Sequence, residues 1–141
     1  MIDKNFWKDR KVFLTGHTGF KGSWMLIWLK ELGCDICGYA LEPEKNSLFN
    51  YLFDNKQKEF RNIYGDINNK EYLQDKILEF NPEIVFHFAA QPLVLESYLS
   101  PLKTWQTNLI GSLNLLESLK SYDQKCSIII ITTDKVYKNK E

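Results

Sequence analysis

The sequence predicts an α/β fold in which a doubly wound parallel sheet ends after about five strands. Two observations support this prediction. Short apolar runs rich in β-branched and aromatic residues alternate with longer segments whose apolar residues recur every three or four positions. This alternation is typical of β-α-β units, whose strands are parallel. A glycine-rich stretch, TGHTGFKG, directly follows the first apolar run, and glycines at that turn are typical of a Rossmann-type sheet.

Five segments are predicted to be strands because each combines β-branched or aromatic residues with turn residues at its ends. The fourth, IVFHF, is an unbroken apolar run of the kind that is buried on both faces of a parallel sheet, and the fifth, SIIIIT, contains four successive isoleucines. The predicted strands are residues 11–15, 35–40, 60–64, 84–88 and 127–132.

Three segments, residues 20–32, 70–80 and 104–119, are predicted to be helices because their apolar residues recur at helical spacing. Residues 41–58 interrupt the pattern with proline and asparagine, and they are predicted to be a loop with one short helical turn. The residues predicted to form the buried faces are Trp24, Ile27, Trp28 and Leu32 in the first helix, Leu73, Ile77, Leu78 and Phe80 in the second, and Leu109, Leu113, Leu116 and Leu119 in the third.

The composition argues against several classes of function. With 141 residues, 44% of them hydrophobic, the chain is long enough for one packed domain and too short for two. The 18 basic and 18 acidic side chains cancel and form no block of like charge, so we expect no nucleic-acid partner and no membrane partner. No apolar signal or spanning segment follows the N-terminus, which predicts a cytoplasmic protein.

The cysteines predict neither disulfides nor a metal site. Three cysteines are an odd number, which argues against a disulfide framework. Cys34 and Cys37 match the C-x-x-C pattern, but residues three apart in a strand point to opposite faces. We therefore expect no shared metal ion and no redox bridge at this pair.

The glycine stretch predicts a binding site for a pyrophosphate. Glycines between a first strand and a first helix permit a tight turn, let backbone N–H groups approach the anion, and let the helix pack closely on the strand. An ATP-type phosphate loop would end in Gly-Lys-Ser or Gly-Lys-Thr, whereas this chain has the order Lys21-Gly22-Ser23. The alternative is that the glycines only terminate the strand. The predicted cofactor-binding residues here are Gly16, His17, Thr18, Gly19, Phe20, Lys21 and Gly22.

The two histidines have different predicted roles. His17 lies in the glycine loop, where it can contact the cofactor or serve as a hydrogen-bonded spacer, and the sequence leaves both roles open. His87 lies within an apolar strand and is predicted to be a core histidine whose hydrogen bonds are satisfied.

Further motifs follow the glycine stretch in a fixed order. The spacing Gly16-x-x-Gly19-x-x-Gly22, followed by GDI at residues 65–67, HFAAQP at residues 87–92 and TNLIGSLNLLE at residues 107–117, resembles the extended short-chain dehydrogenase/reductase superfamily. The resemblance implies bound NAD. NADP is not excluded, because the acidic residue that normally ends the second strand is missing and Glu42 is only a late candidate. It also implies that Asp66, Ile67, Ala89, Ala90, Gln91 and Asn108 bind the cofactor.

Within that superfamily, the stretches TGHTGFKGSW, GYALEP, PEIVFHFAAQPLV and TTDKVYKNKE are most similar to nucleotide-sugar 4,6-dehydratases that act on CDP-glucose in dideoxyhexose and O-antigen synthesis. The resemblance implies that NAD takes a hydride from sugar C4, that water is eliminated across C5 and C6, and that the hydride returns to C6. It implies that Thr133 bonds the 4-hydroxyl, that Asp134 protonates the departing 6-hydroxyl, and that Lys135 assists proton removal at C5.

One motif of the superfamily is missing. A Tyr-x-x-x-Lys pair should follow the fifth strand, and Tyr137 does not qualify because Glu141 stands where lysine should be. We therefore expect residues 1–141 to be an incomplete NAD-binding domain without its substrate-binding region, from a parent enzyme that is a homo-oligomer. Two alternatives remain: a nucleotide-sugar 4-epimerase or reductase of the same superfamily, and a non-catalytic dinucleotide-binding module.

Overall fold

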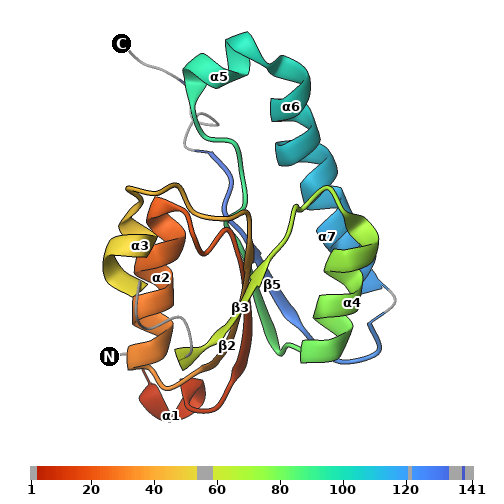
Figure 1. The fold of residues 1–141 in the computed structure, drawn as a ribbon. Coiled ribbons are helices and arrows are strands. Elements are labelled where there is room, and N and C mark those ends of the chain that lie inside the picture. The colour runs from red at the N-terminus through yellow and green to blue at the C-terminus, as the bar shows by residue number, and fades with distance from the viewer. Residues whose placement is uncertain (1–2, 54–58, 121, 134–137, 139–141) are drawn as a thin grey trace.

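The computed structural model describes residues 3–53, 59–120, 122–133 and 138, and its centre is a parallel sheet of five strands (Figure 1). The strand order is β3-β2-β1-β4-β5, so the direction of winding reverses at β1. This arrangement confirms the predicted fold class. The strands are β1 (Lys11–Thr15), β2 (Asp35–Ala40), β3 (Arg61–Tyr64), β4 (Ile84–His87) and β5 (Ser127–Ile130).

Helices cover both faces of the sheet. Figure 1 shows α2 and α3 on one face and α4 and α7 on the other, while α5 and α6 extend beyond the edge where the strands end. No helix in the described part of the chain is long and apolar enough to cross a membrane. The helical elements are α1 (Lys4–Trp7), α2 (Phe20–Glu31), α3 (Leu48–Phe53), α4 (Lys70–Phe80), α5 (Val94–Leu99), α6 (Pro101–Trp105), the π-helical turn η2 (Gln106–Ile110) and α7 (Gly111–Lys120).

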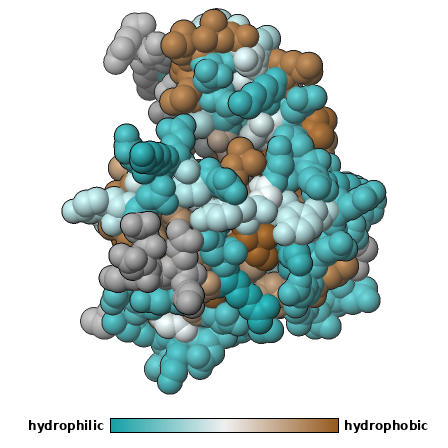
Figure 2. Space-filling model, in the orientation of Figure 1, coloured by the Kyte–Doolittle hydropathy of each residue, from teal (hydrophilic) through white to brown (hydrophobic). Residues whose placement is uncertain are grey.

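Helix α3 is the short helix predicted within residues 41–58, whereas α1 and α5 were not predicted and the last helix begins earlier than predicted. That helix begins at Pro101, which occupies a first-turn position where its missing N–H is not needed. Helix α5 buries none of its residues, so no apolar periodicity marks it. Figure 2 shows hydrophobic side chains over this end of the molecule, and Leu95 and Leu99 of α5 are both largely exposed.

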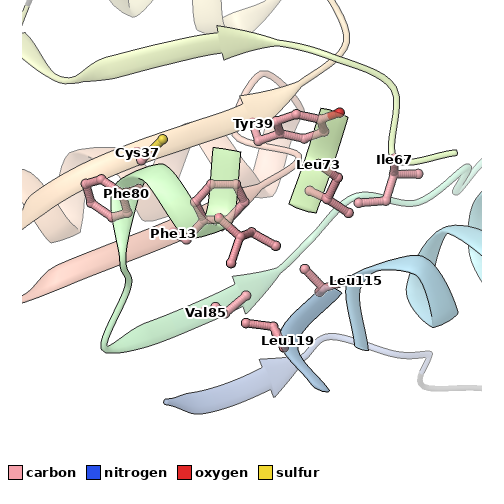
Figure 3. Close-up of a cluster of buried hydrophobic side chains, with 10 residues drawn as sticks. Phe13, Cys37, Tyr39, Ile67, Leu73, Phe80, Val85, Leu115 and Leu119 are labelled. Atoms are coloured by element: carbon pink, nitrogen blue, oxygen red, sulfur yellow. The ribbon is translucent and has the colours of Figure 1, made fainter. Parts of the chain in front are cut away.

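The core has two parts because β1 is buried on both faces. Phe13 points to the face beneath α4 and α7, where it packs with Tyr39, Leu73, Ile77, Leu115 and others (Figure 3). Its neighbours Val12 and Leu14 point to the other face and pack with residues of α2 and α3. Cys34 and Cys37 also pack in the two different clusters, as expected for residues that point to opposite faces.

The predicted buried face of α2 is wrong for its two tryptophans, although Leu32 is buried and Ile27 packs against the core as predicted. Trp24 and Trp28 are 54% and 51% exposed, whereas Leu26 and Leu29 are buried together with Gly22 and Ser23. The reason is steric. A Cβ atom on Gly22 would lie 2.1 Å from the carbonyl oxygen of Gly16, so the helix approaches the glycine loop on its small-residue face and turns the tryptophans outward.

The predicted buried face of the last helix is also largely wrong, for the same steric reason. Leu109, Leu113 and Leu116 are exposed, while Gly111, Leu115, Ser118 and Leu119 are buried. A Cβ atom on Gly111 would lie 2.5 Å from Cγ2 of Ile67, so this face of α7 also packs closely on its neighbours. In α4, Leu73, Ile77 and Phe80 are buried as predicted, but Leu78 is 46% exposed.

Candidate functional site

A cleft of about 300 Å³ lies at the carboxyl edge of the sheet, beside β1, where the winding direction reverses. Ligands bind at this position in open α/β sheets. Three residues of the glycine loop line the cleft, and so do four residues predicted at the ends of β3 and β4. These are Gly16, Thr18 and Gly19 of the loop, and Asp66, Ile67, Ala89 and Ala90.

Six predicted cofactor-binding residues do not line this cleft: His17, Phe20, Lys21, Gly22, Gln91 and Asn108. Other lining residues were not predicted. Tyr39, Ala40 and Leu41 come from the end of β2, and Lys103, Gln106 and Thr107 come from α6 and η2. The β2 residues could have been inferred, because the end of the second strand belongs to this edge in any sheet of this order. Nothing in the sequence marks Lys103 or Gln106.

The three loop glycines serve different steric needs. Gly16 has φ +74°, and a Cβ atom there would lie 2.6 Å from the backbone nitrogen of Ala89, so this glycine makes the turn possible. Gly22 permits the close approach of α2 described above. Gly19 is less constrained within the protein, since its Cβ would make a single tight contact, with Gly16 O at 3.3 Å. Because Gly19 is exposed and lines the cleft, its missing side chain leaves room for a ligand.

The start of α2 is suited to an anion. Gly19 is the N-cap, no side chain caps the helix, and the first turn contains no acidic residue. The N–H groups of the first turn form the positive end of the helix dipole, and no carboxylate of this turn competes with a bound anion for them.

The side chain of His17 lies beneath the loop and not in the cleft. It is fully buried, its Nε2–H donates to Oδ1 of Asn62 at 2.7 Å, and its ring packs against Phe49 and Phe60. Burial lowers the pKa of His17 to about 4 although the hydrogen bond to Asn62 opposes this shift. Of the two open roles, this geometry favours the hydrogen-bonded spacer.

The turn after β3 holds Asp66 in place. The Tyr39 hydroxyl donates to the carbonyl oxygen of Asp66 at 2.9 Å, and Oδ1 of Asp66 accepts from the backbone N–H of Asn68 at 2.9 Å. A Cβ atom on Gly65 would collide with the Tyr39 ring at 2.5 Å. The GDI motif therefore forms a rigid turn at the edge of the cleft.

Gly111→Ala is expected to lower the free energy of unfolding by about 1 kcal/mol, because overpacking against Ile67, about 2 kcal/mol, exceeds the gain in helix propensity, about 1 kcal/mol. Ile67 lines the cleft, so ligand affinity should fall as well. Urea unfolding measures the first effect. The exposed neighbour Leu113→Ala is the control and should change stability by less than about 0.5 kcal/mol. Equal stability of Gly111→Ala and the unaltered chain would contradict the packing argument.

Asn108 holds the loop that follows β4. Its Oδ1 accepts from the backbone N–H of Gln91 at 2.7 Å, and its Nδ2 donates to the carbonyl oxygen of Gln91 at 3.1 Å. The Gln91 side chain bonds the backbone of Leu93 in the same loop and the hydroxyl of Thr104 in α6. Both residues therefore shape the wall of the cleft without lining it.

The ends of β5 and β2 complete the edge. Thr133 is exposed beyond the end of β5, at the carboxyl edge, while Asp134 and Lys135 lie outside the described residues. At the end of β2, Leu41 lines the cleft and Glu42, the late candidate for a ribose contact, does not. Within residues 3–53, 59–120, 122–133 and 138, no three His, Cys, Asp or Glu side chains cluster as metal ligands would.

A parallel sheet that reverses at β1, with a glycine loop and a cleft at its carboxyl edge, places the chain in the class of Rossmann-type nucleotide-binding folds. Comparison with known proteins specifies the family. Residues 13–140 match the model of the family described as GDP-mannose 4,6 dehydratase, and the chain belongs to this family.

Similar sequences have related names. The chain is 50% identical over 142 residues to the CDP-glucose 4,6-dehydratase of Salmonella typhimurium, a match that includes 100% of this chain and 39% of that protein. It is 32% identical over 127 residues to the CDP-paratose 2-epimerase of Salmonella typhi, over 90% of this chain and 38% of the relative. The chain thus spans about two-fifths of the length of these relatives.

Similar solved structures include an epimerase with its cofactor. The UDP-glucose 4-epimerase of Thermus thermophilus in complex with NAD matches with a TM-score of 0.69 and 30% identity, over 79% of this chain and 34% of that one. The structure of Pal from Bacillus thuringiensis matches with a TM-score of 0.78 and 25% identity, over 90% of this chain and 40% of that one.

Proposed function

We propose that this chain is the NAD-binding part of a nucleotide-sugar 4,6-dehydratase whose substrate is CDP-glucose. The observation that carries the proposal is the 50% identity over the whole chain to a protein named CDP-glucose 4,6-dehydratase. The cleft at the carboxyl edge supports it, because a dinucleotide is expected at that position in this fold.

The described residues fit a dinucleotide. The uncapped first turn of α2 offers N–H groups to a pyrophosphate, and the missing side chain of Gly19 gives the anion access to them. Asp66 and Ile67 lie where the adenine end is expected, in the rigid turn after β3. When bound, NAD supplies the hydride acceptor for oxidation at the sugar C4.

The elimination is proposed to depend on residues after β5. Thr133 would donate a hydrogen bond to the sugar 4-hydroxyl, Asp134 would protonate the leaving 6-hydroxyl oxygen, and Lys135 would assist removal of the C5 proton. Thr133 lies beyond the end of β5 at the carboxyl edge of the sheet, and the cofactor cleft opens on the same edge. A lysine can assist only if its surroundings lower its pKa.

The cofactor is proposed to be NAD, with weak discrimination against NADP. An acidic residue at the end of the second strand normally bonds the ribose hydroxyl and repels a 2′-phosphate. Here β2 ends with Ala40 and is followed by Leu41, and both line the cleft without a charge.

Isothermal titration of the 141-residue chain with NAD⁺ is expected to give saturable binding, and NADP⁺ should bind within about tenfold of the same affinity, because the end of β2 carries no charge that would repel a 2′-phosphate. Incubation with CDP-glucose and NAD⁺ should yield no product, since no Tyr-x-x-x-Lys pair follows the fifth strand within these 141 residues. Absence of NAD⁺ binding by the folded chain would contradict the proposal. Product formation would contradict the assignment of an incomplete catalytic set.

An assay of the full-length parent distinguishes a 4,6-dehydratase from the alternative enzyme, a nucleotide-sugar 4-epimerase or reductase. Incubated with CDP-glucose and NAD⁺, the parent should form a 4-keto-6-deoxy sugar product. Interconversion of sugar epimers would instead indicate a 4-epimerase, the activity named for the Thermus thermophilus neighbour. Binding without any reaction in the parent would favour a non-catalytic module. Assembly of the parent as a homo-oligomer stays a prediction.

A further inference from the structure

His87 is a buried ionisable residue that the proposed reaction does not use. It ends β4, it is 1% exposed, and it is not among the residues that line the cleft. Both of its ring nitrogens have partners on other elements. Nδ1 lies 2.7 Å from Oγ1 of Thr15, the last residue of β1, and Nε2 lies 2.9 Å from Oγ of Ser112 in α7.

The surrounding hydrogen bonds determine where the ring proton lies. Thr15 Oγ1 accepts from the backbone N–H groups of Phe88 and Ala89, each at 3.2 Å, so its own proton is directed to Nδ1 of His87. Ser112 Oγ donates to the carbonyl oxygen of Asn108 at 2.8 Å, so it must accept from the ring. His87 is therefore neutral, with its proton on Nε2.

This chain of hydrogen bonds joins three walls of the cleft. Thr15 immediately precedes Gly16, and the two N–H groups that Thr15 accepts begin the loop after β4. Ser112 bonds Asn108, which lies within the π-helical turn η2, where the Gly111 N–H bonds Gln106 O five residues back. Asn108 in turn clamps both backbone groups of Gln91. A continuous series of hydrogen bonds thus runs from the end of β1, next to the glycine loop, through His87 to Asn108 and Gln91.

We propose that His87 is a positioning residue. It connects β4 to η2 through Ser112 and thereby keeps the walls of the cleft in the arrangement that binds the dinucleotide, and we call this connection the latch. An apolar residue could fill the space of the ring, but the Thr15 and Ser112 hydroxyls would lose their common partner. Without that connection, Asn108 and the Gln91 loop are free to shift relative to Gly16. The inference rests on the proposed function, because the cleft is taken to hold the dinucleotide.

The chain offers a matched control for Ser112. Ser118 lies on the same helix, is fully buried, and donates to the carbonyl oxygen of Asn114 at 2.7 Å, which is the same i−4 bond without a histidine. Ser112→Ala is expected to weaken NAD⁺ binding about tenfold, whereas Ser118→Ala should change it by less than about twofold. Ser112→Thr retains the hydroxyl and should restore the affinity.

The double variant His87→Leu/Ser112→Ala should bind NAD⁺ no more weakly than His87→Leu alone, because both substitutions break the same connection. Additive losses, or unchanged affinity in Ser112→Ala, would overturn the latch. Calorimetry measures the affinities, and circular dichroism establishes that each variant is folded.

Two measurements on the unliganded chain are independent of NAD⁺. The protein has two histidines, so ¹⁵N spectra with His17→Gln for assignment can identify the His87 tautomer, which should be protonated at Nε2. Hydrogen exchange of the Gln91 backbone N–H should accelerate in Ser112→Ala and not in Ser118→Ala. An Nδ1–H tautomer, or unchanged exchange, would overturn the inference. If NAD⁺ fails to bind the unaltered chain while both results hold, the proposed function fails and the latch stands.

Discussion

Gly22→Ala is expected to lower the free energy of unfolding by about 3 kcal/mol, which is a large part of the stability of a small domain. The added Cβ atom would lie 2.1 Å from Gly16 O and 2.8 Å from Gly16 C, and neither is the end of a flexible side chain. Helix α2 would have to move away from the sheet, and Leu26 and Leu29 would lose packing. Urea unfolding followed by circular dichroism measures the loss.

Gly19→Ala is the matched comparison, because the same change is made three residues earlier on the same loop. Its Cβ atom would meet Gly16 O at 3.3 Å, and its φ of −75° suits alanine, so stability should fall by less than about 1 kcal/mol. NAD⁺ affinity should fall at least about tenfold, because the methyl group occupies the approach to the first turn of α2. Unaltered stability of Gly22→Ala, or unaltered NAD⁺ binding by Gly19→Ala, would contradict these roles.

Acidification from about pH 7.5 to about pH 5 is expected to remove about 4 kcal/mol of stability, about 2 kcal/mol from each histidine. Burial lowers the pKa of His17 and the pKa of His87 from 6.5 to about 4. Below pH 6.5 the unfolded chain binds protons that the folded chain does not, so stability falls with decreasing pH. The loss from these two residues ends near pH 4, where the folded chain is protonated as well.

Urea unfolding at the two pH values measures this loss, and His17→Gln and His87→Gln should each remove about half of the pH dependence. Comparing the pH dependence within each variant separates titration from any direct effect of the substitution. Glu83 does not interfere, because the Lys11 backbone N–H lowers the pKa of Glu83 and its contribution is lost only at more acidic pH. A stability that is constant between the two pH values would contradict the neutral state of both rings.

The sheet could be predicted from the sequence because its strands are short, apolar and separated by clear turn residues. β1 and β2 have the predicted bounds, and β3, β4 and β5 lie within the predicted ranges. The parallel order followed from the alternation with helices, since a crossover helix requires the strands to be parallel. Helix α5 could not be predicted in this way because it buries no residue.

Residues of the candidate site could be predicted where a short sequence motif by itself determines the local backbone conformation. Gly16 and Asp66 belong to local turns, and both line the cleft. Lys103 and Gln106 were missed because they reach the cleft only through the placement of α6 and η2 over the carboxyl edge. The role of His17 could not be decided because the residue that binds it, Asn62, lies 45 positions away.

The sequence by itself determined the succession of the five strands along the chain, the glycine loop and the family resemblance, because these depend on local pattern and spacing. Only the tertiary structure decided which faces of α2 and α7 are buried. Hydrophobicity favoured the tryptophans and the leucines at positions 109, 113 and 116, but Gly22 and Gly111 lie on the opposite faces. A helix approaches its neighbours closely where its side chains are smallest, and that contact exists only once the elements are packed together.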